Sequence, residues 1–173
     1  MRWTIALPVA LLTATPAHAD PIAVSKSVTI VSDPVGDLTP RSLPGSIADY
    51  RTTASNPLGN LFQPVRNLVL VETLPATVDL RVVDLAGAGR GPVEFSDGNL
   101  LGTGLLSSGL TYSYSTANPG NDSIEFFNGT SWSYQPVPDS EGYDRNVRAM
   151  RITLSSTFAT NTSFQLRYRV KIR

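Results

Sequence analysis

Apolar and polar residues alternate in short runs along most of the chain, and Gly, Pro, Asn or Asp residues bound each run. This period-2 alternation is typical of strands with one buried face, and no stretch after the first twenty residues keeps the spacing of an amphipathic helix. The pattern therefore predicts an all-β protein, and so many short strands favour a two-sheet antiparallel β-sandwich. The expected strands are Ala23–Val31, Ser46–Ala54, Pro64–Glu72, Val78–Val83, Val93–Phe95, Leu110–Ser115, Ser123–Phe127, Thr130–Gln135, Val147–Leu154 and Ser163–Ile172.

The last expected strand has the most regular pattern, so one of its faces should lie in the core and the other in solvent. Outward charges commonly protect a strand from pairing with another chain, and this interpretation is favoured here. The alternative is that Arg167 and Arg169 bind an anionic partner such as lipopolysaccharide or an acidic polysaccharide. The apolar face carries Phe164, Leu166, Tyr168, Val170 and Ile172, and the polar face carries Gln165, Arg167, Arg169, Lys171 and Arg173.

A tight turn is expected at Asn128-Gly129, between the strands Ser123–Phe127 and Thr130–Gln135. This residue pair tolerates the positive φ angles that both central positions of a type I′ turn require. The sequence therefore predicts a two-residue β-hairpin at this point.

The first nineteen residues have the features of a secretory signal peptide. A basic start at Met1-Arg2 precedes the apolar run Trp3–Leu12, and Ala17-His18-Ala19 has the small-x-small pattern of a cleavage site. We expect cleavage before Asp20 and export to the periplasm, the cell surface or the medium. The apolar run is too short to span a bilayer, so the mature chain, residues 20–173, is expected to be one domain without a membrane span.

Composition limits the catalytic and metal-binding groups that the mature chain can offer, because the only His is His18 and Cys is absent. The mature chain therefore lacks the imidazole and thiolate of the common nucleophilic catalysts and of zinc, copper and iron sites. We expect no enzyme activity and no cofactor. The whole chain has 14 basic and 14 acidic residues, and losing Arg2 leaves thirteen against fourteen, which gives no sign of a nucleic-acid partner.

Two loops have residues that are compatible with ligands. Asp139, Glu141 and Asp144 form a weak calcium candidate, although acidic loops are more often simply solvated. The Gly-rich segment 87–91 resembles a phosphate loop only superficially, because Pro92 follows it and no helix begins there. A strand connection is the favoured interpretation of that segment.

Half of the fourteen aromatic residues lie in one 32-residue window, 112–143. Trp132, Tyr134 and Tyr143 are the candidates for stacking on sugar rings, as in a carbohydrate-binding module. Tyr112 and Tyr114 share parity with Leu110, and Trp132 shares parity with Tyr134, so these side chains most simply fill the space between two sheets. Core packing is the favoured interpretation of the window.

The segment PGSIADYRTTASNPLGNLFQPVRNLVLVETLPATVDLRVVDL resembles the immunoglobulin-like "conserved repeat" domain of bacterial and archaeal surface proteins. The matching positions are Pro44-Gly45, Tyr50, Asn56, Val65–Val71 and Glu72-Thr73-Leu74-Pro75, with Glu72 where the family usually has Asp. The resemblance implies an immunoglobulin-like sandwich in an extracytoplasmic setting, with a stalk, adhesive or interaction role. It brings no catalytic residues.

These observations predict a secreted or surface-exposed structural or interaction module whose partner is a protein, a surface polysaccharide or a second copy of the chain. Self-association is expected through the N-terminal strand Ala23–Val31, whose only charge is Lys26. The alternative is a carbohydrate-binding adhesin that uses the aromatic window.

Overall fold

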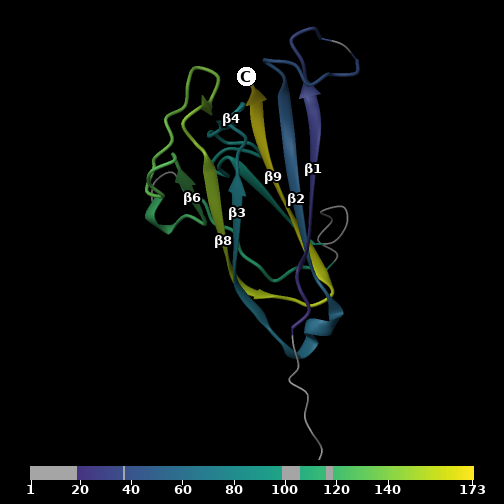
Figure 1. Cartoon of the computed structure of the whole chain (residues 1–173). Coiled ribbons are helices and arrows are strands. Elements are labelled where there is room, and N and C mark those ends of the chain that lie inside the picture. The colour runs from purple at the N-terminus through teal and green to yellow at the C-terminus, as the bar shows by residue number, and fades with distance from the viewer. Residues whose placement is uncertain (1–18, 37, 99–105, 116–118) are drawn as a thin grey trace, which may run out of the picture.

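The structure, a computed structural model, describes residues 19–36, 38–98, 106–115 and 119–173. Two antiparallel sheets pack against each other around one apolar core (Figure 1), so the predicted all-β sandwich is confirmed. One sheet has the order β1-β2-β9-β4-β7, with β5 also paired to β9, and the other has the order β3-β8-β6. The strands are β1 (Ala23–Ser32), β2 (Ile47–Asn56), β3 (Val65–Thr73), β4 (Val78–Arg81), β5 (Val93–Asp97), β6 (Ile124–Phe127), β7 (Tyr143–Asp144), β8 (Ala149–Phe158) and β9 (Thr162–Ile172), and the 3-10 turns are η1 (Leu58–Phe62) and η2 (Pro119–Asn121).

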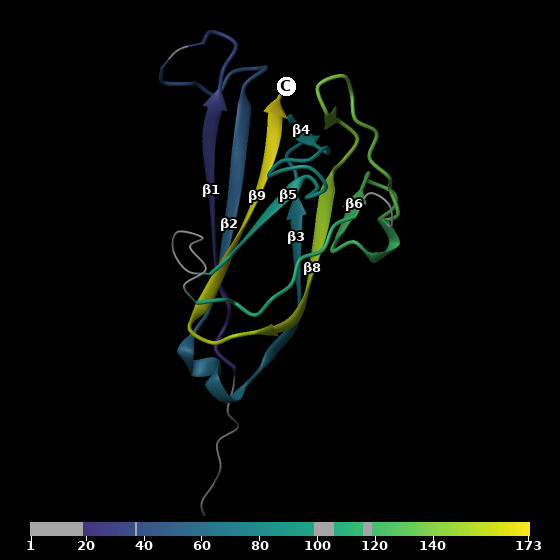
Figure 2. The same cartoon turned by 180° about the vertical axis from the view of Figure 1, so that it is seen from behind.

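The last strand, β9, lies in the centre of the larger sheet. It pairs with β2 along its whole length, while β4 and β5 share its other edge, as Figure 2 shows from behind. Its predicted apolar face is confirmed, because Phe164, Leu166, Tyr168 and Val170 are buried. The interpretation of its outward charges as protection of an edge is wrong, because both edges of β9 are occupied.

The outward cations of β9 are instead paired with carboxylates from neighbouring strands. Asp49 on β2 accepts hydrogen bonds from Arg169 Nε at 2.6 Å and from Arg167 Nη1 at 3.0 Å. Arg167 also pairs with Glu94, Lys171 with Glu141 and Arg173 with Asp79. Burial alone would raise the pKa of Asp49, but the hydrogen bonds and charges of Arg169 and Arg167 lower it below its usual range.

A polar cluster crosses the core between the two sheets, centred on Glu72 of β3, which is 8% exposed. Its Oε1 accepts a hydrogen bond from Thr52 Oγ1 at 2.5 Å, and its Oε2 accepts one from Tyr168 Oη at 3.3 Å. Lys26 of β1 donates to the same Oε2 at 2.5 Å, with its ammonium 5.1 Å from the centre of the Tyr50 ring. A carboxylate placed this deep needs such partners, since an unpaired buried charge is costly. Burial and the neighbouring Glu72 together raise the pKa of the Tyr168 hydroxyl.

Two expected strands are not regular strands. Leu110–Ser115 runs beside β8 and forms a single bridge, from Thr111 to Ser155, while Thr130–Gln135 forms only the bridge from Tyr134 to Phe126. The edge of β6 that a hairpin partner would occupy is thus nearly bare, and β6 pairs instead with β8. The short strand β7 was not expected.

The predicted type I′ hairpin is also wrong. Gly129 has a positive φ of 97°, but Asn128 does not have a positive φ. The Asn128 side chain accepts hydrogen bonds from the backbone N–H groups of Thr130 and Ser131, both at 2.9 Å. This local side-chain turn replaces the two-residue hairpin.

In the described ranges no helix has the length and hydropathy needed to cross a membrane.

The arginine–carboxylate pairing gives a test. Asp49→Asn should lower the free energy of unfolding by about 2 kcal/mol at pH 7, because Asp49 is buried and receives hydrogen bonds from two charged donors. The folded-state pKa of Asp49 is depressed, so this contribution is present above the unfolded pKa of about 3.9 and is lost as the pH falls through the folded value.

Urea unfolding measured from pH 2 to pH 7 checks this expectation. Glu125→Gln is the matched control, because the pair of Glu125 with Arg151 is exposed and should contribute about 0–1 kcal/mol. A difference between wild type and Asp49→Asn that stays constant across this pH range would contradict the proposed role of Asp49.

Candidate functional site

The edge strand β1 is the most unusual surface of the protein. Among the described residues β1 pairs with β2 alone, so the backbone groups along its other edge have no strand partner. Every residue of β1 except Ile30 is exposed, and Val24 and Val28 are 61% and 54% exposed. A long, uncovered edge strand with exposed apolar side chains is a template for pairing with another chain.

The exposure of Val24 and Val28 follows from the different widths of the two sheets. Both residues lie opposite core-facing residues of β2, Ala54 and Tyr50, so they share the inner face of the larger sheet. The smaller sheet leaves this part of the inner face uncovered. Lys26, between the two valines on the same face, reaches Glu72 of β3 and supplies a link from β1 to the opposite sheet.

The other edges are less suited to pairing. Strand β3 is also long, but its register shifts between Arg66 and Leu68, where Asn67 has a positive φ of 54°. Such a bulge interrupts the regular row of hydrogen-bonding groups. Strands β6 and β7 have only four and two residues. The register of β1 shifts only near its C-terminal end, between Ile30 and Ser32.

A second surface feature is a cavity of about 450 Å³ beside β6, here called the aromatic cavity. Its aromatic lining comes from Tyr114, Phe126, Trp132 and Tyr134, and its carboxylates are Asp122 and Glu125. Aromatic rings combined with hydrogen-bonding groups are suited to ring-shaped polar ligands such as sugars. The remaining lining residues are Val82, Ser115, Gly120, Ile124, Ser133, Gln135 and Pro136.

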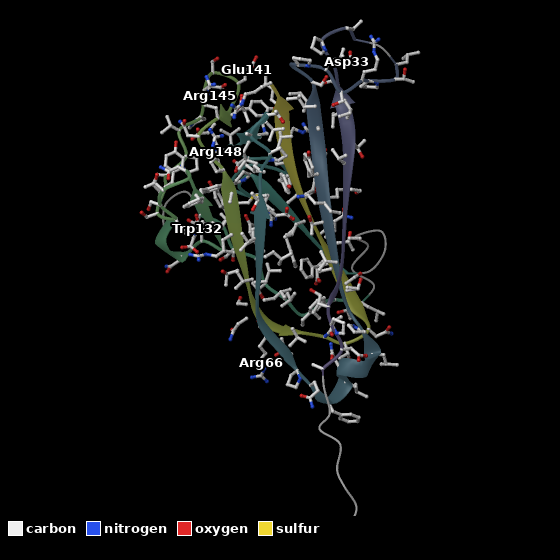
Figure 3. The ribbon with its side chains drawn as sticks, in the orientation of Figure 1. Asp33, Arg66, Trp132, Glu141, Arg145 and Arg148 are labelled. Carbon is white, nitrogen blue, oxygen red and sulfur yellow. The ribbon has the colours of Figure 1, made fainter. Side chains whose placement is uncertain are left out.

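The side chains around the aromatic cavity already have partners within the protein. Trp132, labelled in Figure 3, stacks on Phe127 with 5.1 Å between ring centres, and the Arg151 guanidinium lies 4.7 Å from the centre of its ring. Tyr134 donates a hydrogen bond to Asp144 at 2.8 Å. These contacts hold two aromatic side chains in place without hiding them, because Trp132 and Tyr134 are both half-buried.

The third predicted aromatic residue, Tyr143, lies elsewhere. It is buried on β7, with the Lys171 ammonium 5.9 Å from the centre of its ring. Its burial raises the pKa of the hydroxyl. The structure thus brings Trp132 and Tyr134 together and adds Tyr114, while Tyr143 belongs to the edge of the larger sheet.

Arg167 and Arg169 do not form a free cationic stripe. Both guanidinium groups are half-buried and bound to Asp49, and Arg167 also binds Glu94. An anionic polymer would have to displace these carboxylates, so the structure gives no support to binding of an anion by these two arginines.

The three carboxylates of the calcium candidate each bind different partners within the protein. Asp139 accepts hydrogen bonds from the backbone of Glu141 and Tyr143, and Glu141 pairs with Lys171. Asp144 accepts hydrogen bonds from Tyr134 and from the backbone N–H groups of Val137 and Asn146. Within the part of the chain that the structure describes, no group of three such residues is placed to hold a metal ion.

The Gly-rich segment 87–91 does cradle an anion, but the anion is a carboxylate of the protein. Asp84 accepts hydrogen bonds from the backbone N–H groups of Gly89 and Gly91, at 2.8 and 2.7 Å. Gly91 also lies against the ring of Tyr114, where an added Cβ would be 2.6 Å from a ring carbon. The segment is therefore a structured connection, in line with the favoured interpretation of its sequence.

Sequence reasoning missed the pairing of Lys26 with Glu72. The available signal was that Lys26 is the only charge of its strand and that Glu72 shares the parity of Leu68 and Leu70, but the pairing itself depends on which strands face each other.

The Lys26–Glu72 contact is testable by a double-mutant cycle. Lys26→Met should destabilise the fold by about 2 kcal/mol, because it leaves the buried Glu72 carboxylate without a cation. The double variant Lys26→Met with Glu72→Gln should recover part of this loss. Thermal and urea unfolding measure the coupling, and strictly additive effects of the two changes would contradict a direct interaction.

Comparisons of the chain with protein-family models, with curated proteins and with solved structures gave no match. The resemblance to the conserved repeat domain therefore stays a prediction from the sequence. The two-sheet sandwich stands on the geometry of the structure, and the function has to be argued from the edge of β1 and from the aromatic cavity.

Proposed function

We propose that the protein is an exported interaction module that associates with a second copy of itself through the free edge of β1. The observation that carries this proposal is a ten-residue edge strand, exposed on both faces, whose single charge is already paired with Glu72. Strand addition gains affinity from main-chain hydrogen bonds and register from alternate side chains. The edge of β1 offers both.

A second copy is favoured as the partner because the edge is neutral and self-complementary. Antiparallel pairing of two β1 strands about a two-fold axis through Val28 sets Val28 against its own copy and Lys26 against Ile30. The two lysines then do not face each other, and each keeps its pairing with Glu72. A charged partner strand would find no complementary charge on β1.

The proposed setting outside the cytoplasm rests on the signal-like residues 1–19, of which residues 1–18 lie outside the described residues. Without disulfides the fold depends on its apolar core. The resemblance to repeat domains of surface proteins supports a structural or adhesive role over catalysis.

Association through β1 predicts that a charge introduced at its free edge weakens the dimer. Val28→Lys should raise the dissociation constant of the dimer of residues 20–173 at least tenfold, because the two introduced lysines would face each other across the two-fold axis. Sedimentation velocity over a range of protein concentrations measures the change. The variant should stay folded, since Val28 is exposed.

Val69→Lys is the matched control, because Val69 is 48% exposed on β3, the other long edge strand. This variant should dimerise like the wild type. A wild-type protein that remains monomeric at high micromolar concentration would refute the proposal, as would equal loss of association in both variants.

Carbohydrate binding is the second candidate function, favoured by the four aromatic side chains and two carboxylates of the aromatic cavity. Carboxylates and serine hydroxyls there would accept hydrogen bonds from sugar hydroxyls, and an aromatic ring would cover the apolar face of the sugar. The two candidate functions use different surfaces and can be tested separately.

If the aromatic cavity binds sugars, Trp132→Ala should abolish binding to a glycan array while lowering the free energy of unfolding by only about 1 kcal/mol. The small cost is expected because Trp132 lies half-buried against Phe127 and Arg151, outside the central core. Tyr143→Phe, outside the cavity, should bind glycans like the wild type. Glycan binding that survives Trp132→Ala would exclude this site.

A further inference from the structure

The backbone of Asp20 is held at both of its polar groups by one buried side chain. Its N–H donates to Asn60 Oδ1 at 2.7 Å, and its carbonyl accepts from Asn60 Nδ2 at 2.9 Å. Asn60 lies in η1, forty residues further along the chain, and is only 1% exposed. A buried amide that binds both backbone groups of one distant residue is a built receptor for that residue.

The receptor is itself fixed by a chain of buried amides. Asn60 Nδ2 also donates to Asn56 Oδ1 at 2.8 Å, and Asn56 Nδ2 donates to the carbonyl of Phe158 at 2.7 Å. Asn56 ends β2 and Phe158 ends β8, so the chain of hydrogen bonds joins one strand of each sheet. The neighbouring Gly59 leaves space for the Asp20 side chain, since an added Cβ would lie 1.9 Å from the Asp20 carboxylate.

Asp20 is also the residue that the small-x-small pattern of Ala17-His18-Ala19 predicts as the first of the processed chain. These are independent observations, one from the sequence before Asp20 and one from hydrogen bonds to Asp20. We propose that Asn60 is the binding site for the α-ammonium group that cleavage of the Ala19–Asp20 bond creates. The inference rests on the predicted cleavage and is independent of pairing through β1.

The cleavage changes the chemical nature of the donor. A signal-peptidase-type protease adds one water across the amide, so that Ala19 leaves with a carboxylate and the nitrogen of Asp20 becomes an amine, which takes up a proton. The N–H···Oδ1 hydrogen bond then has a charged donor, and such bonds are about twice as strong as neutral ones. Processing therefore strengthens the attachment of the segment that leads into β1.

The attachment matters because β1 has few other contacts with the sandwich. Beyond its pairing with β2 it has the Lys26–Glu72 contact and the packing of Ile30 against the core, and Ile22, just before it, also packs against the core. The side chains that form the described hydrogen bonds of this receptor, those of Asn60 and Asn56, are uncharged. The charge state of the α-amine should therefore have a measurable effect on the stability of the fold.

The test compares three proteins: residues 20–173 with a free amine, the same chain acetylated at Asp20, and the free-amine chain with Asn60→Ala. The first readout is acylation of the α-amine at pH 7, followed by mass spectrometry of the N-terminal peptide. Acylation should be about tenfold slower in the free-amine wild type than in Asn60→Ala, as a difference of 1.4 kcal/mol implies. Asn121→Ala, in the exposed turn η2, should react like the wild type.

The second readout needs no substitution and so survives any failure of Asn60→Ala to fold. Binding by Asn60 raises the folded-state pKa of the α-amine above its unfolded value of about 7.7. The free-amine chain should therefore be more stable than the acetylated chain below that pH, and the advantage should fade as the pH rises through the folded value.

Two results would overturn the proposal. One is equal acylation rates in the wild type and in a folded Asn60→Ala variant, together with parallel stability curves for the free and acetylated chains. The other is an exported protein whose N-terminal residue, read by mass spectrometry, is not Asp20. Neither result bears on dimerisation through β1, which the Val28→Lys variant tests separately.

Discussion

The placement of β9 in the middle of the larger sheet is the constraint on which the rest of the fold depends. Its apolar face fills the core between the sheets, and its other face carries cations that can lie beside three neighbouring strands only if carboxylates neutralise them. Asp49, Glu94 and Asp79 on those strands do so, together with Glu141 from the loop before β7. The pairing of β2, β4 and β5 with β9 is thereby fixed by charge as well as by backbone hydrogen bonds.

On the inner side of the sandwich, too, a charged side chain is neutralised by partners from several strands. Glu72 is buried because three strands of the opposite sheet supply it with partners, through Thr52, Tyr168 and Lys26. This cluster links β3, an edge strand of the smaller sheet, to β1, an edge strand of the larger sheet. The difference in width between the two sheets leaves Val24 and Val28 uncovered, so the polar cluster marks the boundary between core and free edge.

Alternation along the sequence was enough to place most strands and to choose the buried face of β9, because a period of two records which side of a strand is apolar. It could not say which strands are neighbours. The charges of β9 were therefore misread as protection of an edge, and the pairing of Lys26 with Glu72 was missed.

Local turn chemistry was also outweighed by long-range pairing. Asn128-Gly129 favours a tight hairpin, yet β6 gains a longer partner in β8, and the Asn128 side chain satisfies the turn by itself. In the candidate site, a shared sequence window correctly grouped Trp132 with Tyr134. It failed for Tyr143, because the turn at residues 139–142 leads that residue to a different sheet.

The direction of the strands has a mechanical consequence. Strands β1 and β9 both run antiparallel to β2, so the start of β1 and the C-terminus lie at opposite ends of the sandwich, as Figure 1 shows. Tension applied between these two points would pull the β1–β2 and β2–β9 ladders along the strand direction. Their hydrogen bonds would then be loaded together in shear, rather than opened one at a time as in peeling. The attachment of Asp20 to Asn60 lies at one end of this path.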